Sequence, residues 1–314
     1  MTTVLYLRSG AFKFGLSTIL LALLLSATLF ALPTGLRTLD RQLRIDVLWD
    51  GESHSETYYQ VQRSDSAEGP FDLLPDIPNF PLYSDYLGEA GKTYYYRVRA
   101  ARREGDVLHP TSEWSKPVVG TSSHFDGVGL LEEMQEAATR YVTIGSHPNS
   151  GLTCEWITTR SPHPGTPLGK RRSERKIGAS GATGMGIMNY IVAVEHGWMT
   201  RAEAAEAVLR ALRFLDTKSE RFHGAFSHWI DNETGEAVPF SKFDDGADIA
   251  ETSLLLQGIL VVREFFDADM SVETELRAVA NRIWLGVDWN HFRKDGGDVL
   301  YWHWSPKHGW KMNM

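Results

Sequence analysis

The chain has 314 residues, more than a single core of about 100 to 200 residues needs, so we expect two folded units. Hydrophobic residues make up 42% and charged residues 23%, which is typical of a globular protein and excludes a disordered or polytopic membrane chain. The net charge of −8 and the lack of an extended basic patch argue against a nucleic-acid partner. Cys154 is the only cysteine, which excludes an intramolecular disulfide and thiolate metal sites.

The N-terminus has the pattern of an export signal. Arg8 and Lys13 precede an uncharged apolar stretch at 15–32. Because this stretch approaches the ~20 residues that span a bilayer, residues 1–33 are interpreted as a signal peptide or a retained membrane anchor. A buried core helix is the less favoured alternative. Both export interpretations place the rest of the chain in the periplasm or outside the cell, with anchoring to the inner membrane left open.

Residues 36–122 show the alternation of polar and apolar side chains that is typical of strands. In the run 93–100, for example, Tyr94, Tyr96, Val98 and Ala100 share one face of the predicted strand. The Leu48-Trp49 pair and the segments RSDSAEGPF (63–71) and AGKTYYYRV (90–98) resemble a fibronectin type III domain. The resemblance implies a β-sandwich without catalytic residues, serving as a spacer or a contact surface.

From residue 126 onward the apolar pattern becomes helical, which predicts an all-α domain at 126–314. The predicted helices cover 128–142, 184–197, 201–216, 246–266 and 273–286. Thr200 and Glu203 have the spacing of a capping box, and Ser271 is a candidate cap for the last helix. The helix at 246–266 has almost no polar face, so we expect other helices to enclose it.

The glycine-rich run at 178–186 matches neither a Walker loop nor the G-x-G-x-x-G pattern. It is interpreted as a site of close backbone packing, with room for a sugar ring as the alternative. His223, His228 and His303 do not have the spacing of a known metal triad, so structural or hydrogen-bonding roles are the default interpretation.

An acidic cluster precedes the most apolar helix. Asp244, Asp248 and Glu251 are spaced four and three residues apart, and they share one face if the helix begins near Asp244. Capping by Asp244 or Asp245 is the alternative for part of the cluster. It does not explain Glu251, which needs a cation partner or a polar cavity beside so many apolar neighbours. For Glu251, a polar cavity is favoured over a structural ion pair.

Eight of the ten tryptophans lie in the helical part. Trp302, Trp304 and Trp310 are expected to be exposed platforms for sugar rings, because they fall in loops where core packing explains them less well. Trp198 and Trp284 lie beside helix ends and are interpreted as core residues.

Five segments in the same order resemble the bacterial glucoamylase-like domain, which includes the endo-β-1,2-glucanases of glycoside hydrolase family 144. They are ASGATGMGIMN (179–189), EHGW (195–198), HGAFSHW (223–229), KFDDGADIAET (242–252) and LYWHWSP (300–306). The resemblance implies an (α/α)6 toroid with its site at the ends of the inner helices. It also implies hydrolysis with inversion, without a metal or an organic cofactor.

The resemblance places the family's acidic site positions on Asp244, Asp248 and Glu251, which are the candidate catalytic residues. The candidate substrate-binding residues are Trp302, Trp304, Trp310, His303, Trp229 and Glu155. Only about five helices of the toroid are predicted before the sequence ends at Met314, so the C-terminal part of the catalytic domain, with a further glutamate of the family, is expected to be missing. The chain alone is therefore expected to be weakly active or inactive.

Three functions remain open. The favoured hypothesis is a glycoside hydrolase of β-linked glucan, with β-1,2-glucan as its substrate, and with a glucan or oligosaccharide as the partner of a monomeric chain. The second is a non-catalytic glycan-binding or degenerate protein that uses the same acids and tryptophans. The third keeps hydrolysis but acts on another glucan or exopolysaccharide, because motif resemblance does not fix the linkage.

Overall fold

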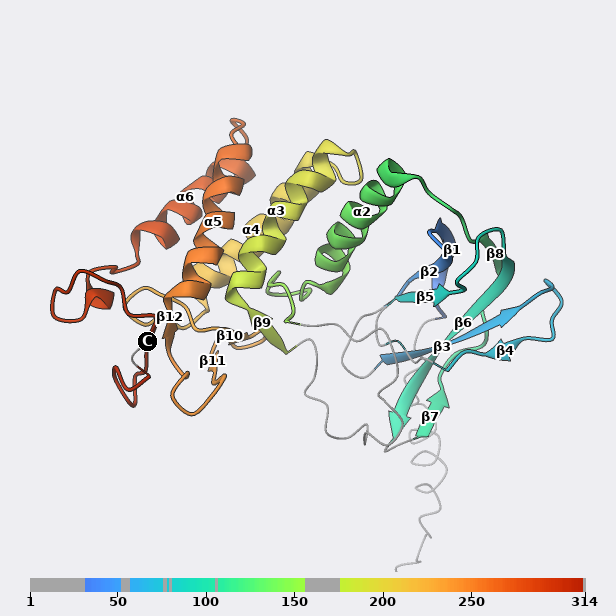
Figure 1. The fold of residues 1–314 in the computed structure, drawn as a ribbon, viewed down its shortest axis with the longest axis horizontal. Helices are drawn as coiled ribbons and strands as arrows, with labels where there is room; N and C mark the ends of the chain where they lie inside the picture. The colour runs from blue at the N-terminus through green and yellow to red at the C-terminus, as the bar shows by residue number, and fades with distance from the viewer. Residues whose placement is uncertain are drawn as a thin grey trace, which may run out of the picture.

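The computed structural model describes residues 32–51, 57–75, 78, 81–104, 107–155 and 176–312. Strands come first along this part of the chain and helices follow (Figure 1). The predicted leader lies outside it except for its last two residues. Among the helices that the structure describes, none combines the length and the apolar character needed to cross a bilayer.

The N-terminal part consists of two antiparallel sheets that share one core. The first sheet has the order β1 (Thr34–Arg41), β2 (Arg44–Asp50), β5 (Leu82–Tyr86). The second has the order β4 (Asp72–Leu73), β3 (Thr57–Ser64), β6 (Thr93–Glu104), β7 (Val107–Pro110), with β8 (Val118–Thr121) also paired to β6. Tyr96, Val98 and Ala100 are buried in the shared core, which confirms the predicted alternation.

The C-terminal part is built on α2 (Gly127–Gly145), α3 (Ser180–Glu195), α4 (Arg201–Thr217), α5 (Ile249–Phe265) and α6 (Ser271–Leu285), followed by the short 3-10 helix η2 (His291–Arg293). Helix α3 packs on α5, and α4 packs on α6. Leucines, isoleucines and valines of these helices form one hydrophobic core. Helix α5 is enclosed only in part, because Val261 on its outer face is 44% exposed.

Two predicted helix starts have different outcomes. The capping box of α4 is confirmed, because the Thr200 side chain accepts from Glu203 N and the Glu203 side chain accepts from Thr200 N. The cap at Ser271 is wrong, since Ser271 is already helical and Met270 occupies the cap without a side-chain bond. Glu273 accepts instead from Ala268 N and from Arg201 of α4, so its carboxylate ties the preceding loop to a neighbouring helix.

The glycine-rich run forms the first turns of α3, which begins four residues before the predicted start. A methyl group on Gly184 would overlap the backbone of Leu254 and Leu255, and one on Gly258 would overlap the backbone of Gly184. The crossing of α3 and α5 is therefore close enough for backbones to touch, and close packing of this run is confirmed.

Short strands gather at one end of the helices (Figure 1). β9 (Ile177–Ala179), β10 (Trp229–Asp231) and β11 (Ala237–Val238) form a three-stranded sheet, and β12 (Ala247–Asp248) pairs with β13 (His303–Trp304). β9 leads directly into α3, and β12 leads directly into α5. The N-termini of these two helices are thus held at the same end of the helical part, and the candidate site lies there.

Charged contacts join the two parts of the chain. Arg44 of β2 lies 2.5 Å from Glu133 of α2, and Arg140 of α2 lies 3.1 Å from Asp46 of β2. Glu133 also accepts from the backbone N–H of Gln42 at 2.9 Å. Asp46 and Glu133 are almost fully buried, so these contacts pack helix α2 firmly against the first sheet.

Candidate active site

Asp248 is the N-cap of helix α5. One carboxylate oxygen, Oδ1, accepts from Glu251 N at 2.9 Å and from Trp302 Nε1 at 2.7 Å. The backbone of Asp248 pairs with His303 in the β12–β13 ladder, so the residue is extended and cannot be part of the helix. The predicted start of this helix at Gly246, and capping by Asp244 or Asp245, are therefore wrong.

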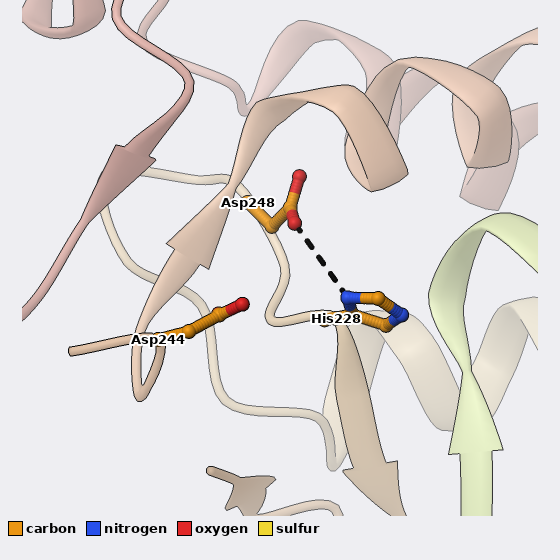
Figure 2. Close-up of side chains that lie close together, drawn as sticks. All are labelled: His228, Asp244 and Asp248. Carbon is orange, nitrogen blue, oxygen red and sulfur yellow. Dashed lines mark ion pairs between the residues drawn. The ribbon is translucent and has the colours of Figure 1, made fainter. Parts of the chain in front are cut away.

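The other oxygen of Asp248, Oδ2, is in an unusual environment. Asp248 is fully buried, and Oδ2 has no hydrogen-bond partner within the described part of the chain. Nδ1 of the His228 ring lies 3.8 Å from Oδ2. Figure 2 marks this contact with a dashed line. Burial raises the pKa of the Asp248 carboxyl above its usual value, and the charge of Asp244 adds to the shift. A buried acceptor of this kind is available to a ligand hydroxyl group.

Glu251 lies one turn into α5 and reaches toward α3. Its Oε2 accepts from Gly181 N at 2.9 Å, and a methyl group on Gly181 would overlap this oxygen. Its Oε1 lies 4.0 Å from Nε2 of His228. Burial raises the pKa of the Glu251 carboxyl despite the opposing charge of His228 and the bond from Gly181. Glu251 thus has the backbone donor and the cationic neighbour that its apolar surroundings require.

Asp244 approaches the same point from the loop before β12 (Figure 2). Its Oδ1 lies 2.9 Å from Nε2 of His303, and both side chains are buried. The three acids come together, but not as one helical face, because Asp244 is in a loop, Asp248 caps the helix and only Glu251 is helical. His303 has no exposed surface, and its ring lies against the Asp244 carboxylate.

The tryptophans differ from the expectation. Trp302, Trp304 and Trp310 are all half-buried instead of exposed, and the last two pack against the helical core. Trp198, interpreted as core, is 39% exposed and stacks on His196. Trp302 nevertheless reaches the site through its bond to Asp248. Trp302 and Trp304 are half-buried because β13 pairs with β12, and this pairing brings the segment 302–304 against the start of α5.

The remaining candidate residues lie around the acids. Trp229 of β10 is buried and packs edge-on against Phe240, with ring centroids 4.7 Å apart. Glu155 is half-buried before β9, and its charge contributes to the raised pKa of Glu251. The structure therefore places Glu155 near the acids, while its contact with a substrate stays a prediction.

His228 is the residue of this site that the sequence analysis did not select. It lies between the carboxylates of Asp248 and Glu251 and stacks on Phe240, with ring centroids 4.4 Å apart. No spacing rule identifies it, because it is brought to the acids by the loop between α4 and β10. Its place in the HGAFSHW motif was the only available signal.

The atoms that His228, Asp244 and Asp248 could offer to a cation all lie within 4.8 Å of one another. Such a set could hold a metal ion, but separations of this size also suit hydroxyl groups that bond to two side chains at once. One Asp244 oxygen is already engaged by His303. The arrangement can thus bind sugar hydroxyls with the residues present.

A β-sheet part followed by a helical part is consistent with a multidomain glucoamylase-like fold. Solved structures of putative glucoamylases from Bacteroides uniformis and Bacteroides caccae match 61% and 60% of the chain, at 34% and 36% identity and a TM-score of 0.53 each. More particularly, the homologues of this chain include β-1,2-glucanases. The predicted resemblance to glucoamylase-like proteins and β-1,2-glucanases is confirmed. No protein-family model matches the chain.

Three relatives illustrate the match. The exo β-1,2-glucooligosaccharide sophorohydrolase of Parabacteroides distasonis is 35% identical over 272 residues, which are 86% of this chain and 35% of the relative. A solved β-1,2-glucanase from that organism has a TM-score of 0.74 at 34% identity, over 90% of this chain and 38% of that one. The endo-β-1,2-glucanase of Chitinophaga pinensis has a TM-score of 0.54 at 34% identity, over 60% and 43% of the two chains. This chain thus spans little more than a third of the curated relative's length.

Proposed function

We propose that this chain forms part of a glycoside hydrolase that acts on β-1,2-glucan. The observation that carries the proposal is the fully buried Asp248, whose Oδ2 has no hydrogen-bond partner in the described part of the chain and lies beside Glu251 and His228. A folded protein tolerates such an acceptor where a ligand completes it. The homology to β-1,2-glucanases supports a glucan as that ligand.

In the proposed mechanism, Asp248 and Glu251 hold or activate a sugar hydroxyl or water, and Asp244, which lies against His303, supports them. Trp302 fixes Asp248 by its indole N–H, so that Oδ2 faces the ligand. Burial raises the pKa of both carboxyls, which is the direction of change that proton transfer by a carboxyl group requires. Inversion requires an acid and a base about 6.5 to 9.5 Å apart, and we propose that the acids described here supply only one of the two.

Three broader predictions belong to the same proposal. The helical part, 126–314, is proposed to be a segment of an (α/α)6 toroid, and the β part, 36–122, a fibronectin type III-like domain. Export to the periplasm or the cell exterior is proposed from Arg8, Lys13 and the apolar stretch after them. The TM-score of 0.74 over 90% of the chain supports a shared arrangement of both parts in the Parabacteroides distasonis β-1,2-glucanase.

The test uses gluco-oligosaccharides of equal length with β-1,2, β-1,3, β-1,4 or β-1,6 linkages. We expect the full chain to bind the β-1,2 compound selectively, and Glu251→Gln to weaken that binding at least about tenfold, as the loss of a charged hydrogen bond does. Release of reducing sugar that disappears in the variant establishes hydrolysis. Selective binding without release assigns the chain to glycan binding, and the absence of both overturns the proposal.

A further inference from the structure

The position of the His228 ring is fixed by an aromatic neighbour. His228 is coplanar with Phe240 within 9°, with ring centroids 4.4 Å apart, and its side chain is 20% exposed. In this orientation Nδ1 faces Oδ2 of Asp248 at 3.8 Å, and Nε2 faces Oε1 of Glu251 at 4.0 Å. Each ring nitrogen is therefore directed at a different carboxylate.

The two distances between the His228 nitrogens and the carboxylate oxygens are longer than hydrogen bonds, and they leave room for a ligand atom between the groups. A separation near 4 Å allows strong electrostatic attraction while a hydroxyl group can still bond to both the nitrogen and the oxygen. The ring is thus close enough to act on the charge of both acids and far enough away to leave their free oxygens open to a ligand.

Asp248 and Glu251 need a neighbouring positive charge if both are to be ionised. Burial raises the pKa of both carboxyls, and the charge of Asp248 disfavours ionisation of Glu251. Glu155 adds to this repulsion at Glu251, and Asp244 adds to it at Asp248. Within the residues that the structure describes, His228 is the one basic side chain that lies within 4.0 Å of either acid.

We propose that protonated His228 is a positioning residue that keeps Asp248 and Glu251 ionised together, so that both can accept hydrogen bonds from hydroxyl groups of a bound gluco-oligosaccharide. The identity of this ligand rests on the proposed function, whereas the effect of His228 on the two acids does not. The charged groups that face the ring are Asp244 from the loop before β12, Asp248 from β12 and Glu251 from α5. Its other neighbours, Phe240 and Trp229, are uncharged.

The first measurement is the titration of the Asp248 and Glu251 carboxyl carbons by NMR in the full chain without ligand. His228→Gln removes the charge, and we expect it to raise both carboxyl pKa values by about one unit, as the loss of an opposite charge at about 4 to 6 Å does. His228→Lys keeps a cation and should restore values near those of the wild type. His196→Gln is the matched control, since His196 stacks on Trp198 away from these acids and should change neither titration.

The second measurement is the affinity for a β-1,2-linked gluco-oligosaccharide between pH 5 and pH 8. His228→Gln should bind about tenfold more weakly at the lower end of this range, where protonation of the acids is most favoured, and His228→Lys should recover most of the loss. A merely structural role of the ring would give equal losses at every pH.

The outcomes separate the two proposals. Unchanged carboxyl titrations in folded His228→Gln overturn the inference, whatever the sugar affinity is. Shifted titrations in a chain that binds no sugar support the inference and overturn the proposed function. Thermal unfolding shows whether each variant is folded, and His228→Asn provides a second neutral variant if His228→Gln is not.

Discussion

At the scale of the residue, Asp248 serves two opposed demands. Its Oδ1 stabilises the fold, because it caps α5 and accepts from Trp302. Its Oδ2 destabilises the fold, because a buried acceptor without a hydrogen-bond partner costs about 1–3 kcal/mol. A cost of this kind is what the proposed binding of a ligand at Oδ2 would offset.

This conflict predicts that Asp248→Asn is a stabilising variant that loses function. The amide oxygen can keep both bonds of Oδ1, while the charge is removed. We expect the melting temperature to rise by about 2–4 °C at pH 7, which corresponds to about 1 kcal/mol in a domain of this size, and sugar binding to be lost. Thermal unfolding and calorimetric titration with a β-1,2-gluco-oligosaccharide measure the two effects.

The stability gain of Asp248→Asn should increase with pH. Because the pKa of Asp248 is raised in the folded state, the wild type loses stability as pH rises through that value, and the variant does not. The gain should therefore vanish in acid. Asp245→Asn is the control: burial opposes ionisation there, but bonds from Ser305 and Lys307 lower the pKa of Asp245, so its substitution should destabilise at pH 7. A lower melting temperature of Asp248→Asn would contradict the argument.

At the scale of the element, the crossing of α3 and α5 determines where the acids lie. Gly184 and Gly258 allow the two backbones to touch, and Gly181 allows its N–H to reach Glu251. The strands β9 and β12 then hold the two helix starts at the same end. The glycine-rich run is thus a packing surface that brings one helix N-terminus to the carboxylate of another.

We predict that Gly258→Ala lowers the free energy of unfolding by about 3 kcal/mol, because its methyl group meets the backbone of Gly184, which cannot move as a side chain can. The separation of α3 from α5 should also weaken sugar binding by drawing Gly181 away from Glu251. Denaturant unfolding and calorimetry measure these effects. Gly127→Ala in α2 is the matched control, since its methyl group meets nothing within 4 Å, and it should be neutral or stabilising. Equal effects of the two substitutions would refute the crossing as the cause.

At the scale of the whole molecule, the β part is fixed to the helical part by ion pairs that include the buried side chains of Arg41, Asp46 and Glu133. Arg44 and Glu133 are 2.5 Å apart, and Arg41 lies 2.5 Å from Glu136 and 3.6 Å from Asp46. Such pairs are expensive to break because the remaining charge stays buried without its partner. We therefore interpret the β part as a structural component of the helical domain rather than a free spacer.

Glu133→Gln tests this coupling. Removing the Glu133 charge breaks the ion pair between α2 and Arg44, which keeps only Asp46 of its own strand as a partner. We expect a loss of about 2 kcal/mol in the free energy of unfolding, together with separate unfolding of the two parts. Denaturant titration followed by both far-UV circular dichroism and tryptophan fluorescence detects the separation. Glu275→Gln removes the exposed partner of Arg213 and should leave the single transition unchanged. One shared transition of wild-type stability in Glu133→Gln would show that the network does not couple the parts.

The sequence by itself determined the order of strands and helices, the capping box at Thr200 and the three acids of the site. These features depend on side chains within one or two turns of each other, where periodicity and capping act. Only the tertiary structure decided that Asp248 caps α5 from a strand, that Trp302 is half-buried against it, and that His228 lies between two carboxylates. Those contacts join segments far apart in the chain, and they depend on how closely α3 and α5 pack and on the pairing of β12 with β13, which local patterns do not encode.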